Sequence, residues 1–390
     1  MIHVNSPLKA LSQGHWFKLI CGASFGHLPA VRNLALAYTL AGADCIDVAA
    51  DPAVIAAAKQ GIEAALEVAA SRGDRLGIGG NLRRPLLMAS LNDGEDPHFR
   101  KAEFNPAICP SDCPRPCERI CPARAIRFET SRSGVIDELC YGCGRCLPVC
   151  PIGQIVTRSY VVAPGAIAQL ILDSGIDAIE IHTQVGRLED FKRLWEAIAP
   201  KVNRLQVLAI SCPDAEGSID YLRSLYAAIA PLPCPLIWQT DGRPMSGDIG
   251  AGTTHAAVKF ARKVLAADLP GHVQLAGGTN HHTVAKLQQQ GLLRTASGAD
   301  KQAIAGIAYG SYARALLAPV LDQLEIADGT ETPEVMPLEQ QPDLLREAVN
   351  LADSLVSPLK IPIELQHTTN DYTPAIDATM TRKPSAPLES

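Results

Sequence analysis

The sequence has no apolar run long enough to cross a membrane. No eighteen consecutive residues of its 390 are apolar, whereas a transmembrane helix needs about twenty. The first ten residues, MIHVNSPLKA, also lack the basic and apolar regions of a secretory signal peptide. We therefore expect a cytoplasmic protein without a membrane span. In that reducing compartment cysteine thiols remain available for metal.

Lysine-rich clusters are absent too. Lys and Arg number 35 against 41 Asp and Glu, which leaves a formal net charge of −6. A negative chain without a basic patch is not expected to bind nucleic acid. Hydrophobic residues make up 47% of the sequence and charged residues 19%, which is ordinary for a globular protein. At this length the chain can form one large domain or two smaller ones.

Cysteine, in contrast, is concentrated in one stretch. Eight of the twelve cysteines lie between Cys109 and Pro151. The second half of this stretch reads CYGCGRCLPVCP, which has the C-x2-C-x2-C-x3-C-P spacing of a bacterial ferredoxin loop. Gly142 and Gly144 allow the backbone to approach inorganic sulfide. The ligands predicted from this run are Cys140, Cys143, Cys146 and Cys150.

The first half of the stretch departs from that spacing. Its cysteines are four residues apart, although the last pair is followed by proline as in a ferredoxin loop. Pro110, Pro114 and Pro116 would interrupt a helix, so we predict a proline-stiffened loop around a metal centre. The ligands predicted from this run are Cys109, Cys113, Cys117 and Cys121.

In two-cluster ferredoxins the fourth cysteine of each run binds the other cluster. If the two runs exchange ligands in this way, one cluster takes Cys121, Cys140, Cys143 and Cys146, and the other takes Cys109, Cys113, Cys117 and Cys150. We expect a 4Fe-4S cluster at the second run, and either a 4Fe-4S or a 3Fe-4S cluster at the first. Structural zinc and disulfides are the alternatives. Zinc sites usually join two separated C-x2-C pairs, and disulfides need an oxidising compartment.

Strand and helix patterns alternate along the rest of the chain. Short apolar runs typical of buried strands are followed by amphipathic stripes, such as Phe191, Leu194, Trp195 and Ile198. The expected strands are 16–22, 45–50, 85–91, 178–182, 205–210, 236–240, 273–276 and 304–309. Eight such units span about 260 residues without the cysteine stretch, near the ~250 of a (β/α)8 barrel. An open doubly wound sheet would show the same alternation, because strand order is invisible in sequence.

We therefore expect an α/β protein with a TIM-like barrel in residues 1–95 and 160–325. A ferredoxin-like iron–sulfur insert at 96–159 separates the third and fourth strands. A C-terminal helical extension follows at 326–361, with an amphipathic helix at 341–356. Residues 362–390 are rich in Thr, Pro and Ser and are expected to form a disordered tail.

Two glycine-containing loops follow the last two predicted strands. In barrels this position often binds phosphate, and glycines let backbone N–H groups approach the anion. The candidate residues are Gly277, Gly278, Gly310 and Ser311. They are candidates for binding flavin mononucleotide (FMN) or another phosphate ligand. The alternatives are glycines that merely end strands, which is common, and a partial ancestral site that no longer binds anything. The loop 242–255 is glycine-rich as well, but it shows no recognisable combination of a nucleophile, a base and a residue that orients the base.

Other histidines and cysteines carry weaker signals. His182, His255, His281 and His282 lie at or after strand ends, where proton transfer is conceivable, although structural roles are more common. We predict no catalytic residue among them. The remaining cysteines are expected to be small core residues: Cys21, Cys45, Cys212 and Cys234.

The cysteine stretch is locally basic. Between Arg100 and Arg158 nine Lys or Arg residues face six acids, a net charge of +3 within a chain of −6. Positive charge favours a reduced cluster and would steer an acidic electron carrier, such as ferredoxin, toward it. An equally good interpretation is that these arginines solvate a protein that holds anionic clusters.

Several segments together resemble one family. They are KLICGASFGHLP near the N-terminus, CPSDCPRPC, the ferredoxin loop and IWQTDGRPMSGDIG. The resemblance is to the light-dependent period modulator (LdpA) family of cyanobacteria and covers residues 1 to about 325. It implies an iron–sulfur protein of the circadian input pathway that senses light-dependent redox state and modulates the clock period. It also implies partners among clock and input-kinase proteins.

The residues therefore support two main functions. The first is a redox-sensing regulatory protein that is not an enzyme. The alternative is a flavin-barrel oxidoreductase that receives electrons through two iron–sulfur clusters. An electron-wire subunit of a larger complex is a third hypothesis. A bound flavin would distinguish the enzyme from the sensor.

Overall fold

Eight parallel strands close into a barrel in the order β1-β12-β11-β10-β9-β8-β3-β2. The computed structural model describes residues 6–76, 82–94, 99–121, 123–129, 133–140, 142–159, 166, 169, 173–242, 252–294, 303–325 and 337–360. The barrel strands are β1 (Trp16–Gly22), β2 (Cys45–Ala49), β3 (Leu86–Asn92), β8 (Ala178–His182), β9 (Val207–Pro213), β10 (Leu236–Asp241), β11 (His272–Ala276) and β12 (Gly306–Tyr309). Closure confirms the predicted TIM-like barrel and rules out an open doubly wound sheet.

Helices surround this barrel because each strand is buried on both faces and each helix presents one apolar stripe. In α6 (Leu188–Ile198) the predicted stripe Phe191, Leu194, Trp195 and Ile198 is buried. The other barrel helices and the short 3-10 turns after them are α2 (Leu28–Leu40), α3 (Pro52–Leu76), η3 (Ala199–Arg204), α7 (Ser218–Ile229), α8 (Thr254–Ala266), α9 (Thr283–Gln289), α10 (Ser311–Leu321) and η4 (Asp322–Glu325). The sequence pattern also predicts a helix at 165–172, but most of these residues lie outside the described ranges.

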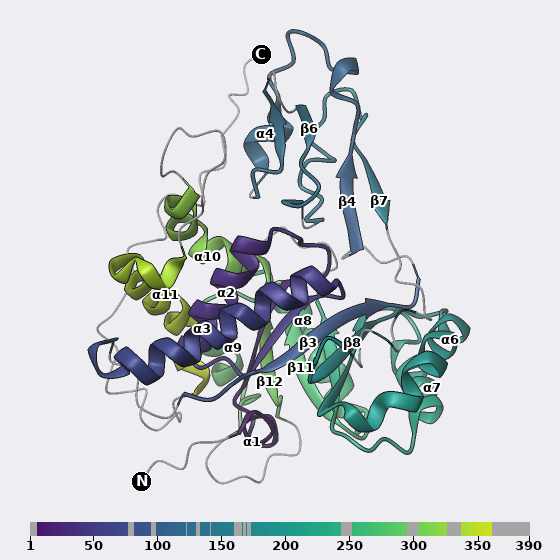
Figure 1. The fold of residues 1–390 in the computed structure, drawn as a ribbon. Helices are drawn as coiled ribbons and strands as arrows, with labels where there is room; N and C mark the ends of the chain where they lie inside the picture. The colour runs from purple at the N-terminus through teal and green to yellow at the C-terminus, as the bar shows by residue number, and fades with distance from the viewer. Residues whose placement is uncertain are drawn as a thin grey trace.

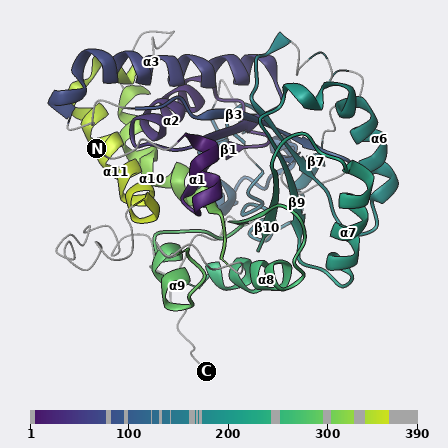
Figure 2. The same cartoon turned by 90° about the horizontal axis from the view of Figure 1, so that it is seen from below.

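A short helix that the sequence patterns did not predict covers the N-terminal end of the barrel. This helix, α1 (Pro7–Gln13), is capped by Ser6, whose side chain accepts a hydrogen bond from the Lys9 backbone N–H. Its Leu11 is 1% exposed and packs with Trp16 and other side chains of the barrel interior. Figure 2, viewed from below, shows α1 across the barrel opening. Seven residues are too few for a reliable helical period, so the pattern missed it.

The C-terminal helix packs directly on the barrel. It is α11 (Pro342–Lys360), preceded by η5 (Leu338–Gln340), and it contacts α2 and α10. Leu345, Leu355 and Leu359 are buried in this contact. Lys360 donates a hydrogen bond to Asp44, which also accepts the Phe17 backbone N–H. This helix matches the expected 341–356 element, whereas the predicted tail at 362–390 lies outside the described residues.

The eight clustered cysteines lie in a lobe whose residues come between β3 and β8 in the chain. We call its described residues between 99 and 159 the cysteine lobe. Two antiparallel pairs organise it, β4 with β7 and β5 with β6, and these strands were not anticipated because they are only three or four residues long. Its elements are β4 (Arg100–Glu103), η2 (Pro106–Ile108), α4 (Pro116–Ile120), β5 (Ile126–Phe128), β6 (Ser133–Val135) and β7 (Val156–Ser159).

The cysteine lobe stands on the C-terminal face of the barrel, opposite α1 (Figure 1). It follows the end of β3, and the Gly26 backbone N–H, in the loop after β1, donates to the Glu138 carbonyl at 3.2 Å. Arg124 of the lobe forms a 2.9 Å ion pair with Asp322, in the turn after α10. The lobe thus occupies the face where barrel active sites form. Within the described residues, no helix is both long and apolar enough to cross a membrane.

Candidate metal centre

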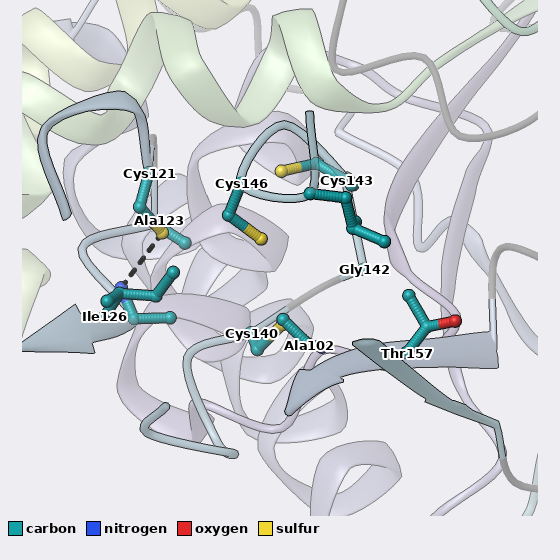
Figure 3. Close-up of a pocket in the computed structure, with 12 residues that line it drawn as sticks. Ala102, Cys121, Ala123, Ile126, Cys140, Gly142, Cys143, Cys146 and Thr157 are labelled. Carbon is teal, nitrogen blue, oxygen red and sulfur yellow. Dashed lines mark hydrogen bonds between the residues drawn. The ribbon is translucent and has the colours of Figure 1, made fainter. Parts of the chain in front are cut away.

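Four cysteines from both runs line one cavity in the cysteine lobe. Figure 3 shows their side chains around this space, with Ala102 and Ile126 also in its wall. Leu147 and Ala125 add further apolar surface. We call this group the inner cradle: Cys121, Cys140, Cys143 and Cys146. They are the same four that ligand exchange between the runs assigns to one cluster.

Glycines let the ferredoxin loop pass close to the lobe's stem. Gly142 and Gly144 have φ of +71° and +72°, a region that side chains rarely adopt. A Cβ atom at Gly142 would lie 2.1 Å from the Arg100 carbonyl oxygen. Both the backbone angle and the close approach therefore require glycine at 142.

Backbone N–H groups hold two sulfurs of the inner cradle. The Ala102 N–H, on β4, donates to Cys140 Sγ at 3.4 Å, and the Ala125 N–H donates to Cys121 Sγ at 3.2 Å. Hydrogen bonds to cluster sulfurs are one of the means by which a protein sets cluster potential.

The remaining four cysteines form a second group. The Cys109 thiol has Cys113 and Cys150 as electrostatic neighbours, and Cys117 has Cys150 and Cys109. Gln154 Nε2 donates to Cys109 Sγ at 2.9 Å, which joins the first run to the end of the second. We call this group the outer cradle, because three of its four members are only half-buried: Cys109, Cys113, Cys117 and Cys150.

The proline-stiffened loop predicted for the first run is interrupted by one short helix. Pro116 is the first residue of α4, where a missing N–H costs nothing, and Cys117 lies within that helix. Arg115 before it has φ of +50° and is unusual for a side-chain-bearing residue. The first run is thus a loop with a single helical turn around the outer cradle.

Five of the eight thiols have a raised pKa and would stay neutral at pH 7 without a bound cation. Burial is the main cause that raises the pKa of Cys109, Cys117, Cys121 and Cys143, and it raises the pKa of Cys146 to about 12. Cys150 differs. Burial would raise the pKa of the Cys150 thiol, but hydrogen bonds from backbone N–H groups, led by that of Ile152, outweigh burial and lower it. Thiolates here need positive charge, which an iron–sulfur core supplies.

The core of the cysteine lobe also fits a metal centre. It contains few apolar side chains, and Cys117, Cys140 and Cys146 are themselves members of that core. So small a core needs a metal or another cross-link for stability. In the described ranges no three His, Cys, Asp or Glu side chains converge as they would on a single ion. The cysteines instead surround a cavity.

A buried charge network inside the barrel was not anticipated. Lys18, on β1, contacts Glu180 and lies 3.2 Å from Asp47, and all three are at most 1% exposed. His182 Nε2 lies 2.8 Å from Glu180 Oε1, which also accepts the Gln239 amide at 2.6 Å. In the sequence, the sign of this network was one charged residue within each of three apolar strands: Lys18 in β1, Asp47 in β2 and Glu180 in β8.

Opposing effects set the charges in this network. Burial would lower the pKa of Lys18, but Asp47 and Glu180 outweigh it and raise the pKa. Burial would raise the pKa of Glu180, but Lys18 lowers it to about 2. For Asp47 burial prevails and raises the pKa to about 6. Lys18 and Glu180 are therefore an ion pair at neutral pH.

The glycines predicted to bind phosphate lie at the ends of β11 and β12. Gly277 and Gly278 have φ of +67° and +94°. A Cβ atom at Gly278 would lie 2.7 Å from the Thr253 carbonyl oxygen, and the Thr253 hydroxyl donates to the Gly278 carbonyl at 2.7 Å. The close contact between this loop and the start of α8 therefore explains the glycine at 278 without any phosphate ligand.

Gly310 and Ser311 lie at the start of α10. Arg314, one turn later, donates to the Ile20 carbonyl at 2.8 Å and to the Ser311 hydroxyl at 3.1 Å. These two loops follow neighbouring strands, as the phosphate-site prediction requires. Phosphate or FMN binding by these four residues stays a prediction.

The histidines do not form one site. His182 belongs to the buried network, and His255 Nε2 lies 3.0 Å from Lys286 Nζ. The rings of His281 and His282 are neighbours, with centroids 3.7 Å apart and a tilt of 46° between their planes. Most of the loop 242–255 lies outside the described residues. Among the other cysteines three are buried and one is half-buried: Cys21, Cys45, Cys212 and Cys234.

The fold and the cysteine lobe together define a class, a βα barrel that carries a ferredoxin-like lobe on its C-terminal face. Residues 109–161 match the LdpA Fe-S cluster-binding domain, and residues 170–358 match the light dependent period A C-terminal domain. Light dependent period A of Synechococcus elongatus is 53% identical over 354 residues, which is 91% of this chain and 94% of that protein. The chain therefore belongs to the light dependent period A family, and its lobe is an iron–sulfur cluster-binding domain.

A solved structure, the apo homocysteine methyltransferase MmuM from Escherichia coli, aligns with a TM-score of 0.37 and 16% identity. The alignment covers 79% of this chain and 97% of that one. That score is too low to carry a functional inference.

Proposed function

We propose that the cysteine lobe holds two iron–sulfur clusters, one in each cradle. The observation that carries this proposal is the division of the eight cysteines into two groups of four, each with three members from one run and one from the other. The ferredoxin spacing of the second run favours a 4Fe-4S cluster in the inner cradle. For the outer cradle we propose a 4Fe-4S or 3Fe-4S cluster.

The function that this arrangement supports best is redox sensing. When bound, such clusters supply reversible one-electron chemistry at nearly constant structure. The protein would sense light-dependent cellular redox state and modulate the period of the circadian clock. The name of the S. elongatus relative and the family of the chain support this context. We propose clock and input-kinase proteins as its partners and place its action in the cytoplasm.

The chain's own residues link the lobe to the barrel. Ala102 donates to a cradle sulfur from β4, and β4 starts one residue after Phe99, which packs against the barrel residue His182. The ion pair between Arg124 and Asp322 is a second link. A change of charge in the inner cradle would act on these contacts and so on surfaces available to partners.

Anaerobic purification tests this function. Iron and acid-labile sulfide analysis should give two clusters per chain, and electron paramagnetic resonance should show two reducible centres. A titration against redox buffers should then change the affinity for a purified clock or input-kinase protein. Colourless protein, zinc in place of iron, or partner affinity that is the same in both redox states would contradict the proposal.

A further inference from the structure

Two segments without any charged side chain meet around the outer cradle. They are residues 104–111 and 146–157, which together contribute Cys109 and Cys150 to that cradle. The hydrogen bond from Gln154 to Cys109 joins the two segments. A surface next to half-buried thiols is thus uncharged on a lobe that is otherwise rich in arginine and acids.

Large apolar side chains are exposed on this surface. Ile108 is 62% exposed, Ile152 is 47% exposed and Val156 is 55% exposed. Ile108 adjoins Cys109, and Ile152 follows Cys150 by two residues. We call these three side chains the apolar apex. Exposed apolar groups scattered singly are ordinary. Here the Gln154–Cys109 hydrogen bond brings together the two segments that carry these side chains, and grouped apolar side chains mark an interaction site.

The apolar apex is unusual within this chain. In the described part of the chain, the exposed large apolar side chains are Leu28, Ile108, Ile120, Ile152 and Val156. All but Leu28 belong to the cysteine lobe, which is much smaller than the barrel. Hydrophobic exposure is therefore concentrated where the proposed clusters approach the surface.

This position suits electron exchange with another protein. Electron transfer slows steeply with distance, so a partner must bring its redox centre next to the more exposed cluster. A charge-free apolar contact loses its water easily and permits that approach. The inner cradle, by contrast, lies against the stem strand β4, through which the lobe meets the barrel.

Charges near the apolar apex indicate the partner's sign. The guanidinium of Arg115 lies 4.4 Å from the centre of the Phe128 ring, and its positive charge reaches the Cys109 thiol of the outer cradle. Between Cys109 and Cys121 two arginines, Arg115 and Arg119, are balanced by two acids, Asp112 and Glu118, so this run is neutral by itself. The whole segment 100–158 carries +3. An acidic partner is favoured, with apolar contact contributing more than charge.

We propose that the apolar apex is the docking surface for an acidic one-electron carrier protein, and that electrons enter at the outer cradle before they reach the inner one. This rests on the proposed pair of clusters. In the transfer the carrier loses one electron and the outer cluster gains it. No bond forms or breaks, and no proton is needed for balance.

Binding is the first test. The holoprotein and its Ile108→Glu/Ile152→Glu variant are titrated anaerobically with oxidised plant-type [2Fe–2S] ferredoxin by calorimetry. We expect the variant to bind at least about tenfold more weakly, as for loss of buried interface anchors. Leu28→Glu is the matched control, because Leu28 is 40% exposed on the barrel and an acid suits the first turn of α2. Equal affinity in all three proteins would overturn the proposal.

Reduction kinetics distinguish a failure of the docking surface from a failure of the proposed clusters. With reduced ferredoxin, stopped-flow absorbance should show the double variant reduced at least about tenfold more slowly than the control. Dithionite, which needs no docking surface, should reduce all three proteins equally. No reducible iron in any of them contradicts the clusters themselves. If dithionite reduces all three proteins normally and ferredoxin reduces the double variant as fast as the control, only the docking surface is overturned. The same holds if the protein forms a concentration-dependent dimer that the double variant dissociates, because the apolar apex would then be a dimer contact.

Discussion

The ring of Phe99 packs edge-on against the ring of His182, with centroids 5.2 Å apart and 81° between the planes. Phe99 begins the cysteine lobe, whereas His182 ends barrel strand β8 and contacts Glu180 of the buried network. Phe99 is fully buried. This contact therefore anchors an iron–sulfur lobe on the polar interior of a barrel.

Phe99→Ala should weaken that anchor. Loss of a buried phenylalanine costs about 3–5 kcal/mol, and the cavity would lie between the lobe and the barrel. We expect the urea midpoint, followed anaerobically by circular dichroism, to fall clearly, while iron per chain stays unchanged. Phe128→Ala, within the lobe and half-buried, is the control and should cost less. A midpoint equal to that of the wild type would show that the contact contributes little.

Cys143→Ser should remove the cluster of the inner cradle alone. Serine cannot replace a thiolate ligand well, so we expect roughly half of the iron and sulfide, with the outer centre kept. The matched control is Cys234→Ser, because Cys234 is half-buried and belongs to neither cradle. Metal analysis and electron paramagnetic resonance measure both variants. Unchanged iron in Cys143→Ser would refute the proposed ligands.

Lys18→Met should destabilise the barrel strongly at neutral pH. It leaves Asp47 and Glu180 buried without their cation, and breaking a buried ion pair on one side costs about 3–5 kcal/mol. The double variant Lys18→Met/Glu180→Gln also removes one of the two unpaired buried carboxylates and should recover part of the lost stability. Urea unfolding of the three proteins at pH 7.5 measures this. A double variant less stable than Lys18→Met would contradict the argument.

The same network gives the pH dependence a definite sign. In the wild type the pKa of Asp47 is raised to about 6, so its contribution to stability is present below its unfolded pKa and is lost as pH rises through about 6. Without Lys18 the pKa values of both carboxyls, Asp47 and Glu180, should be higher than in the wild type, because each loses an attractive charge. The deficit of Lys18→Met relative to wild type should therefore shrink between pH 7.5 and pH 5.5. Unfolding curves at these two values check it.

Truncation should distinguish the tail from the helix before it. Removal of the residues after Pro362 should leave cluster absorbance and the melting temperature unchanged, because the predicted tail contributes no core. A chain ending at Gln341 lacks α11, whose leucines are buried and whose Lys360 contacts Asp44, and should lose much of its stability. Thermal melts of both truncations measure this. A large loss in the first would show that the tail is folded.

The redox-sensing function predicts that no flavin is bound. Heat treatment should release no yellow chromophore, and the supernatant should lack flavin fluorescence. If FMN is released at about one per chain, the oxidoreductase alternative is favoured. Gly310→Asp would then be the next variant, because a carboxylate would repel phosphate at the start of α10.

The sequence by itself determined the elements whose signals are local. Cysteine spacing and the glycines between them predict a cluster loop, because ligand geometry restricts a few neighbouring residues. Apolar runs and stripes predicted the eight barrel strands and helices such as α6 and α11, since each depends on its own period.

Only the tertiary structure decided what depends on residues far apart in the chain. Closure of the barrel requires β1 to pair with β12, and strand order leaves no trace in sequence. Likewise Lys18 and Glu180 read as isolated charges until the barrel brings their strands together. Cys121 is an intermediate case, because the ferredoxin analogy in the sequence grouped it with the second cysteine run only on condition of ligand exchange, and in the structure it lines the same cavity as that run. Such contacts are fixed by packing of the whole chain, not by local preference.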